Sequence, residues 1–392
     1  MYSLLLVLIY VAFISLGLPD SLLGSGWPVM HAQLGVPVDY MGIVTMVISG
    51  CTIVSSLFSD KLSRRPGTRW VTVISVFLTA AALLGFSFAS KFWMLILFAV
   101  PYGLGAGAID AVLNNYVAQR YKSKHMSWLH CFWGVGTIAS PFVMSYALSS
   151  STWNMGFRII GFVQLGIGAL LLLTVPVWKA VGKEEVRIEQ KSRGLGPVGA
   201  LKIKGVPFLL CGFFAYCAAE ATTTQWASTY FVSVKGLAAE TAAQLASLFY
   251  IGITVGRLVS GFFTDKLGDR KMILIGTGIL LVGVVLLALP IEGYASAVAA
   301  FVIIGLGCAP IYPCIIHATP GNFGAENSGA IIGIQMASAY MGFTFMPPLF
   351  GLIGSKAGFS FMPYYLLAFF VLMLIMVELT FRSAAKRRSL DK

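Results

Sequence analysis

The sequence predicts an all-α polytopic membrane protein of twelve transmembrane helices, arranged as two halves of six. Of the 392 residues, 58% are hydrophobic and only 11% are charged, whereas soluble domains carry about a quarter charged residues. The apolar runs continue over twenty residues or more, which is the length that a helix needs to cross a bilayer. A membrane β-barrel would instead alternate apolar and polar residues.

Short polar connections separate the predicted helices. The first apolar run lacks a basic start, and its apolar character resumes after Asp20, so we interpret it as a transmembrane helix and not as a signal peptide. Prolines are expected to interrupt the first helix and the tenth. The predicted helices span residues 3–30, 40–59, 70–89, 92–118, 127–149, 156–178, 206–233, 239–264, 272–291, 295–317, 325–353 and 360–381.

The longest connection, a mixed-charge stretch with Gly194, Gly196 and Pro197, divides the helices six and six. We therefore expect an N-terminal half at 1–180, a cytoplasmic linker at 181–204, and a C-terminal half with a basic tail at 205–392. A repeat supports this division, because an acid followed by basic residues comes after the second helix and again after the eighth. The two acids are Asp60 and Asp265, 205 positions apart.

The basic residues fix the expected orientation. With both termini placed in the cytoplasm, 22 of the 27 Lys and Arg residues fall at cytoplasmic helix ends, which is the positive-inside pattern. The net charge of +12 is thus explained by topology and by contact with lipid headgroups, and no nucleic-acid partner is expected. We expect a monomer in the plasma membrane, most simply a bacterial inner membrane.

No cofactor, metal site or enzyme is expected. The six Cys residues lie in apolar runs, without metal-ligand spacing to His and without the features of a disulfide framework. The glycine-rich run at 103–107 is not a phosphate loop, because it lies inside an apolar span and no Lys-Ser/Thr follows it. We find no Ser–His dyad and no His/Asp metal pair in the pattern.

Three acids lie within predicted spans and are the candidates for ion coupling: Asp20, Asp110 and Glu220. A carboxylate inside a bilayer costs roughly 3 kcal/mol on insertion scales, so function is its default explanation. The glycines that precede Asp110 are expected to let a neighbouring helix approach closely. The structural alternatives are a kinked helix whose backbone satisfies Asp20, and an interhelical hydrogen-bond cluster around Glu220.

The predicted substrate site gathers polar and aromatic residues from several spans. Glu220 and Thr224 share one helix face, and hydroxyl, amide and indole groups suit the hydroxyls and ring of a sugar. The titratable His130 is as readily a simple hydrogen-bonding residue. The predicted contacts are Asn114, His130, Trp133, Glu220, Thr224, Gln225, Trp226, Tyr312 and Gln335.

The repeated acidic-basic connections are predicted to form a cytoplasmic latch between helices. Its expected members are Asp60, Arg64, Arg257, Asp265 and Arg270. The alternative interpretation, which is compatible with the first, is a charge cluster that only sets topology.

These residues resemble the major facilitator superfamily, and within it the fucose–galactose–glucose:cation symporter branch. The second connection, Gly261–Lys271, is similar to the signature of that superfamily's helix 2–3 loop, whereas the first has serine at both glycine positions. Five parts of the chain resemble that branch: Leu18–Leu23, Asp110 with Asn114–Val117, Leu129–Gly134, Glu220 with Trp226 and Tyr230, and Ala309–Pro313.

The resemblance implies a symporter that works by alternating access, in which Asp20 and Asp110 carry or relay the coupling proton. Glu220 looks like an acid of sodium-coupled members, so the ion stays open. His130 and Trp133 stand where the family has Gln and Asn as sugar contacts, a departure that argues against fucose itself. The alternatives are a proton-coupled exporter of a drug or metabolite and, more remotely, a non-transporting membrane sensor.

Overall fold

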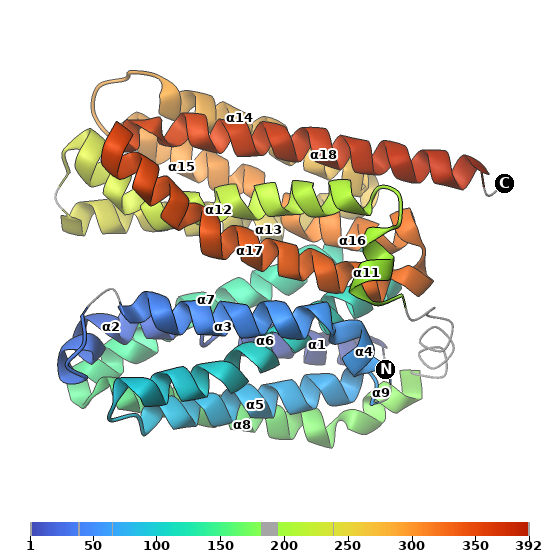
Figure 1. Cartoon of the computed structure of the whole chain (residues 1–392), viewed down its shortest axis with the longest axis horizontal. Coiled ribbons are helices and arrows are strands. Elements are labelled where there is room, and N and C mark those ends of the chain that lie inside the picture. The colour runs from blue at the N-terminus through green and yellow to red at the C-terminus, as the bar shows by residue number, and fades with distance from the viewer. Residues whose placement is uncertain (1, 38–39, 65, 182–194, 238, 391–392) are drawn as a thin grey trace. The chain divides into compact units, whose positions relative to one another are not determined.

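The computed structural model describes residues 2–37, 40–64, 66–181, 195–237 and 239–390, and these residues are almost entirely helical (Figure 1). Residues 182–194 of the predicted linker lie outside the described residues. The long helices are α1 (Tyr2–Gly17), α2 (Leu22–Gln33), α3 (Met41–Leu57), α5 (Thr68–Ser87), α6 (Phe92–Arg120), α7 (Ser123–Ser150), α8 (Trp153–Leu173), α12 (Val206–Lys235), α13 (Ala239–Leu267), α14 (Asp269–Ala288), α15 (Ala295–Cys308), α16 (Ile311–Phe323), α17 (Ala325–Ala357) and α18 (Met362–Leu390).

Short helices connect some of the long ones: α4 (Ser59–Ser63), α9 (Val175–Val181), α11 (Gly196–Leu201) and the 3₁₀ helix η2 (Phe359–Phe361). Within the described residues, ten segments are long and apolar enough to cross a membrane. The other two predicted spans are α3, which has 17 residues, and α13, which has 29 residues. The fold is that of a polytopic membrane protein with twelve transmembrane helices, as predicted.

The first and tenth spans are broken at proline, as the sequence predicts. The chain turns at Pro19 between α1 and α2, and at Pro310 between α15 and α16. A break frees backbone groups that must find other partners inside a membrane. At the second break, the hydroxyl of Tyr216 donates to the carbonyl of Cys308 at 2.9 Å, so a side chain of α12 satisfies it.

The contacts divide the chain into two compact units that exchange two segments. Unit 1 comprises 1–116, 129–197 and 325–337, and unit 2 comprises 117–128, 198–324 and 338–392. The start of α17 thus belongs with the first unit, and the connection between α6 and α7 belongs with the second. The predicted boundaries of the two halves at 180 and 205 stay a prediction.

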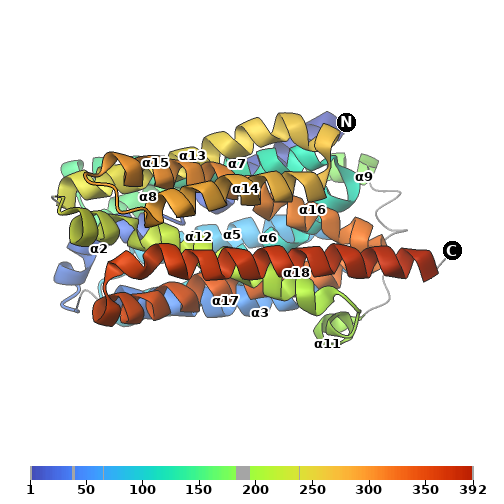
Figure 2. The same cartoon turned by 90° about the horizontal axis from the view of Figure 1, so that it is seen from above.

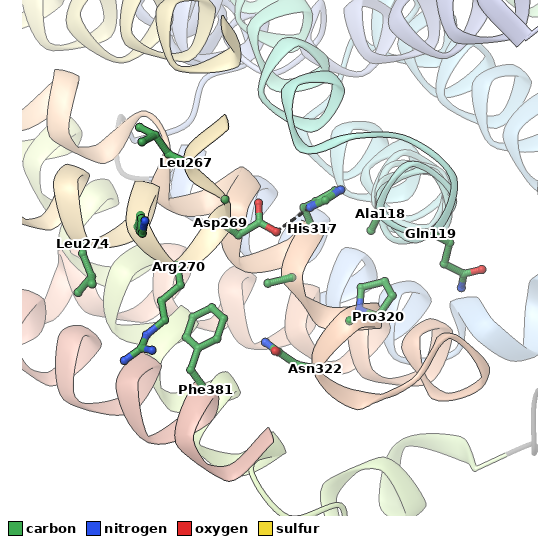
Figure 3. A pocket seen from close by; sticks show the side chains of 14 residues that line it. Ala118, Gln119, Leu267, Asp269, Arg270, Leu274, His317, Pro320, Asn322 and Phe381 are labelled. Carbon is green, nitrogen blue, oxygen red and sulfur yellow. Dashed lines mark hydrogen bonds and ion pairs between the residues drawn. The ribbon is translucent and has the colours of Figure 1, made fainter. Parts of the chain in front are cut away.

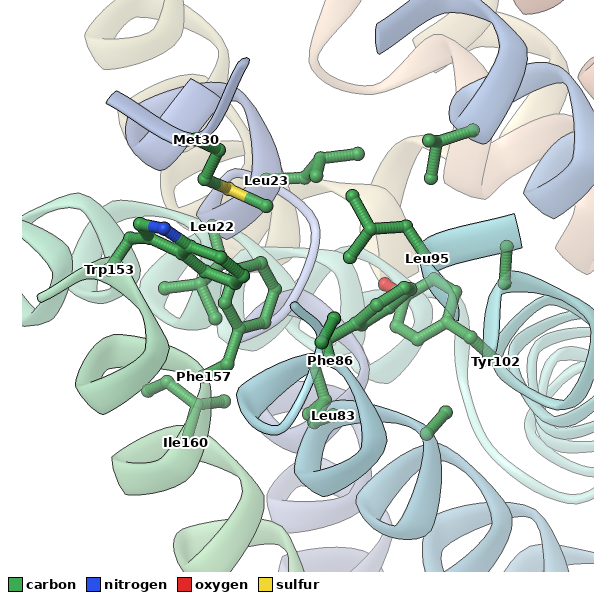
Figure 4. Packing of buried hydrophobic residues seen from close by; sticks show 14 of the residues in the cluster. Leu22, Leu23, Met30, Leu83, Phe86, Leu95, Tyr102, Trp153, Phe157 and Ile160 are labelled. Atoms are coloured by element: carbon green, nitrogen blue, oxygen red, sulfur yellow. The ribbon is translucent and has the colours of Figure 1, made fainter. Parts of the chain in front are cut away.

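Glycines allow the close helix packing of unit 1. A Cβ at Gly103 would lie 2.3 Å from the carbonyl oxygen of Ile48, and one at Gly107 would lie 2.3 Å from that of Thr52. Only glycine therefore lets α6 approach α3 this closely. Apolar side chains of α2, α5, α6 and α8 form a buried core of this unit around Phe86 and Phe157 (Figure 4).

In unit 2, α12 packs between α13 and α18, and α14 packs on α15 and α16. Helices α14 and α18 also lie side by side, in the views of both Figure 1 and Figure 2. This arrangement places Glu220 of α12 next to α13, and it brings the ends of α14, α16 and α18 together.

Candidate functional site

Asp20 lies in the turn between α1 and α2, where it is exposed and held from two sides. Trp133 of α7 donates its indole N–H to Oδ2 at 2.8 Å, and Tyr102 of α6 donates its hydroxyl to Oδ1 at 3.2 Å. The partners are side chains of two other helices, so a local backbone cluster does not explain this acid. The break in the helix therefore presents a carboxylate that stays accessible while two neutral donors fix its orientation.

Asp110 belongs to a buried chain of three polar side chains in unit 1. Asn114, one turn further along α6, donates from Nδ2 to Asp110 Oδ1 at 2.8 Å. Its Oδ1 lies 3.2 Å from Nε2 of His130 on α7. All three side chains are at most 5% exposed. The predicted ion-coupling acid is thus joined through an amide to a titratable imidazole.

Glu220 forms the corresponding acidic site of unit 2, but with a cation as partner. Nη2 of Arg257 on α13 lies 3.5 Å from its Oε1, and both residues are buried. The other oxygen, Oε2, is buried and has no hydrogen-bond partner within the described residues. A buried carboxylate oxygen without a donor is costly, so this atom has capacity left for a proton or a ligand.

The placement of Arg257 corrects one prediction. We expected it in the latch with Asp265, because only eight residues separate them. The structure instead buries Arg257 against Glu220, since eight residues are more than two turns of helix and carry it deep along α13. The sequence interpretation relied on proximity along the chain and overlooked that Glu220 needs a counter-charge.

The remaining predicted substrate residues of unit 2 do not all gather at Glu220. Thr224 is half-buried and donates within its own helix to the carbonyl of Ala221, and Gln225 is exposed. Trp226 donates its only N–H to the carbonyl of Pro347 at 2.8 Å. Its ring packs against Phe350 and Phe359. Trp226 is therefore a packing residue in this structure, and we remove it from the candidate site.

Tyr312 and Gln335 are both buried. The ring of Tyr312, just after the proline break, packs against Phe213 at 4.7 Å between centroids, and against Tyr216 at 6.2 Å. It thus lies beside the helix turn that precedes Glu220. Gln335 is fully buried in α17, within the part of that helix that belongs to unit 1.

The first repeated acid lies against the start of α17 in unit 1. Arg64 binds Asp60 through two nitrogens, at 2.7 and 3.2 Å. A Cβ at Gly329 would lie 2.6 Å from Asp60 Oδ1, so a larger residue there would require the carboxylate to shift. Nearby, Ser328 donates to Asn115 at 2.7 Å. A carboxylate beside the first turn of a helix is favourably placed, because the helix dipole is positive there.

The second repeated acid is used in the same way in unit 2. Asp265 accepts a hydrogen bond from the backbone N–H of Lys124, in the first turn of α7, at 3.2 Å. The ammonium of Lys124 lies 3.7 Å from its other oxygen. Arg270 turns elsewhere and binds Glu378 of α18 at 2.8 Å. Both repeated acids therefore contact the beginning of a long helix.

Sequence reasoning missed several partners in these clusters. Tyr102 of α6 was overlooked because nothing in its apolar surroundings pointed to Asp20. His317 and Asp269, which bind each other at 2.7 Å, were also missed. One signal could have found them: Asp269 directly follows Gly268, at a position where the loop signature has a basic residue.

Comparisons with known proteins agree with the fold. The model of the Major Facilitator Superfamily matches residues 9–245 and 236–392. Bypass of stop codon protein 6 of Saccharomyces cerevisiae is 22% identical over 67% of this chain and 57% of its own length, so the chain spans little more than half of that relative. The membrane sensor protein UhpC of Salmonella typhimurium is 24% identical over 74% of this chain and 71% of its own.

Among solved structures, the chain is similar to the transporter FucP in the outward conformation. The TM-score is 0.79 at 13% sequence identity, and the match covers 96% of this chain and 98% of the other. FucP is the fucose:proton symporter of E. coli. At this identity, the likeness shows the fold alone.

Proposed function

Because the chain belongs to the Major Facilitator Superfamily, whose members are transport proteins and not enzymes, we propose that it is a secondary active transporter. Its proposed substrate is a monosaccharide or a related small polar solute, moved by alternating access with a proton or sodium ion. The proposed orientation puts both termini in the cytoplasm, from the distribution of basic residues.

The observation that carries this proposal is the buried chain from Asp110 through Asn114 to His130. In one state, the amide donates a hydrogen bond to an ionised Asp110 and accepts a hydrogen bond from the N–H of His130. If the amide turns over, a protonated Asp110 donates to Asn114, and Asn114 donates to the imidazole lone pair. Both protonation states of Asp110 can thus be fully hydrogen-bonded, which is what an ion-coupling acid requires.

The accessible Asp20 supplies a second acid in the same unit, and its donor Trp133 is one turn beyond His130 on α7. We propose that Asp20 exchanges the ion with the aqueous side while Asp110 holds it in the interior. The proposed solute contacts are Asn114, His130, Trp133, Glu220, Thr224, Gln225, Tyr312 and Gln335.

A second candidate is an exchanger of an anionic solute, and Arg257 is the observation that favours it. A buried guanidinium binds phosphate or carboxylate in a two-pronged geometry. Its present contact with Glu220 is a single long one at 3.5 Å. A substrate anion could take that place once Glu220 is protonated.

The test is solute uptake by proteoliposomes that contain the purified full-length chain. Radiolabelled hexoses, deoxyhexoses and hexose phosphates are offered under an imposed proton gradient and, separately, under an imposed sodium gradient. Accumulation of one neutral sugar with one ion supports the symporter, and exchange of a phosphorylated sugar without a gradient supports the second candidate. Absence of any transport would contradict both and favour an exporter of other solutes or a sensor.

A further inference from the structure

His317, in the middle of α16, places each of its ring nitrogens against an acceptor. Nδ1 lies 2.7 Å from Oδ2 of Asp269, and Nε2 lies 2.9 Å from the backbone carbonyl of Tyr121. A carbonyl oxygen can only accept a hydrogen bond, and so can an ionised carboxylate. Both ring nitrogens must therefore be supplied with a proton.

A neutral imidazole has one N–H and one lone pair, so it cannot satisfy both contacts. Either the ring is the doubly protonated imidazolium, or Asp269 carries the additional proton. The imidazolium is favoured, because an imidazole binds a proton far more tightly than a carboxylate does, with reference pKa values of about 6.5 and 3.9. In both cases, the pair carries one proton more than a neutral imidazole and an ionised carboxylate would together carry.

The pair fastens one particular segment. Asp269 also accepts a hydrogen bond from the hydroxyl of Ser123, so this acid and His317 together bind two positions of the connection between α6 and α7. The segment 117–128, which includes the end of α6 and the start of α7, belongs to unit 2, whereas the rest of both helices belongs to unit 1. We call the contacts of Tyr121 and Ser123 with His317 and Asp269 the clasp.

Water reaches the clasp from one side. The side chains of His317 and Asp269 are 19% and 16% exposed, and both line a cavity of about 880 Å³ (Figure 3). Figure 3 shows the two side chains pointing toward each other, while Arg270 extends away toward Phe381. Protons can therefore exchange between the pair and the aqueous phase at this end of the helices.

Two ion pairs lie near the clasp. Asp265 of α13 binds Lys124 of the fastened segment, and Arg270 of α14 binds Glu378 of α18. Lys271 of α14 is on the lining of the cavity, and Cys314 of α16 lies 3.9 Å from the Ser123 hydroxyl. Within the described residues, no group of three possible ligands could hold a metal ion here.

We propose that the clasp is a proton-controlled fastener, closed when His317 is an imidazolium and loosened when the ring loses its proton. Loss of the proton turns a ring lone pair toward either Tyr121 O or Asp269 Oδ2, which removes one charge-assisted hydrogen bond. In the proposed orientation the clasp faces the cytoplasm. A rise in cytoplasmic pH then deprotonates His317 and weakens the attachment of the segment 117–128. The clasp itself can be tested without any assumption about the substrate.

The first test reads the protonation state directly by NMR. The chain has only four His residues, so histidine-selective ¹⁵N labelling of the full-length protein in nanodiscs gives few signals, and His→Gln variants assign them. We expect the ring of His317 to have both nitrogens protonated at pH 7. A neutral ring with one protonated nitrogen at that pH would overturn the proposal.

The second test measures hydrogen exchange of the backbone amides in the segment, corrected for the intrinsic pH dependence of exchange. Between pH 6 and pH 9, protection of the wild-type segment should fall roughly tenfold, the factor that one hydrogen bond to a charged group is worth. His317→Gln should show the low protection at both pH values, and His125→Gln, in the same segment, should behave like the wild type. Amides of α8 report whether each variant is folded.

Protection that is independent of pH in the wild type, or an unchanged pH dependence in His317→Gln, would contradict the clasp. Should His317→Gln fail to fold, Asp269→Asn serves instead. It keeps the size of the side chain but removes the charge that binds the imidazolium, so it too should abolish the difference between the two pH values.

Discussion

The two buried acids, Asp110 and Glu220, have different kinds of partner. Asp110 accepts a hydrogen bond from the neutral amide of Asn114, and that amide in turn contacts the ring of His130. Glu220 faces a permanently charged guanidinium, that of Arg257, at 3.5 Å. One cluster can lose its charge by taking up a proton, whereas the other keeps a positive charge whatever Glu220 does, because arginine is not deprotonated in proteins.

This difference assigns different roles to the two acids. Protonation of Asp110 removes its charge while Asn114 can still bind it by a hydrogen bond, so the site can alternate between two forms at small cost. Protonation of Glu220 leaves a buried cation with its counter-ion removed, which is expensive unless an anion arrives. We therefore expect Asp110 to dominate ion coupling, and the pair of Glu220 and Arg257 to act in stability or in binding an anionic group.

The largest expected effect follows from breaking the ion pair. Glu220→Gln removes the carboxylate that faces the buried Arg257 and should lower the free energy of unfolding by roughly 3 kcal/mol, as for other buried pairs. The double variant Glu220→Gln with Arg257→Met removes both charges and should recover most of that loss. Thermal unfolding in detergent measures all of these variants side by side.

The double variant is the control in this series. If it is as unstable as Glu220→Gln alone, the loss comes from packing around position 220 and the ion pair is not its cause. If Glu220→Gln is as stable as the wild type, Arg257 has found another partner, and the proposed contrast between the two acids fails.

Asp110→Asn should change transport and hardly change stability. The amide keeps an oxygen in place to accept the hydrogen bond from Asn114 and removes the titrating group. We expect gradient-driven accumulation to be abolished, while exchange between labelled and unlabelled solute persists. Accumulation by the variant at the level of the wild type would show that Asp110 is not the coupling acid.

The sequence was sufficient for those features that depend on one helix. The twelve spans, the breaks at Pro19 and Pro310, and the close approach allowed by Gly103 and Gly107 follow from local composition and spacing. Within one helix, i and i+4 side chains must meet, so the contact between Asp110 and Asn114 was also expected.

Contacts between helices were harder to predict. The pairing of Glu220 with Arg257 joins positions 37 apart in the chain, and that of His317 with Asp269 joins positions 48 apart. Spacing along one helix says nothing about which face of a second helix opposes it. Trp226 shows the reverse error: it was grouped with Glu220 because both are polar and near in sequence, yet its indole binds Pro347.

The smallest expected effect tests whether Trp226 lies outside the substrate site, with two matched substitutions. Trp226→Phe removes one hydrogen bond, to the carbonyl of Pro347, and should cost about 1 kcal/mol of stability. It should leave the KM for transport unchanged, because this ring packs among Phe350 and Phe359. Trp133→Phe removes an equivalent N–H, but one that orients Asp20 at 2.8 Å, so it should alter transport and its pH profile. A change of KM in Trp226→Phe as large as in Trp133→Phe would return Trp226 to the substrate site, and would mean that the polar stretch after Glu220 acts as one surface.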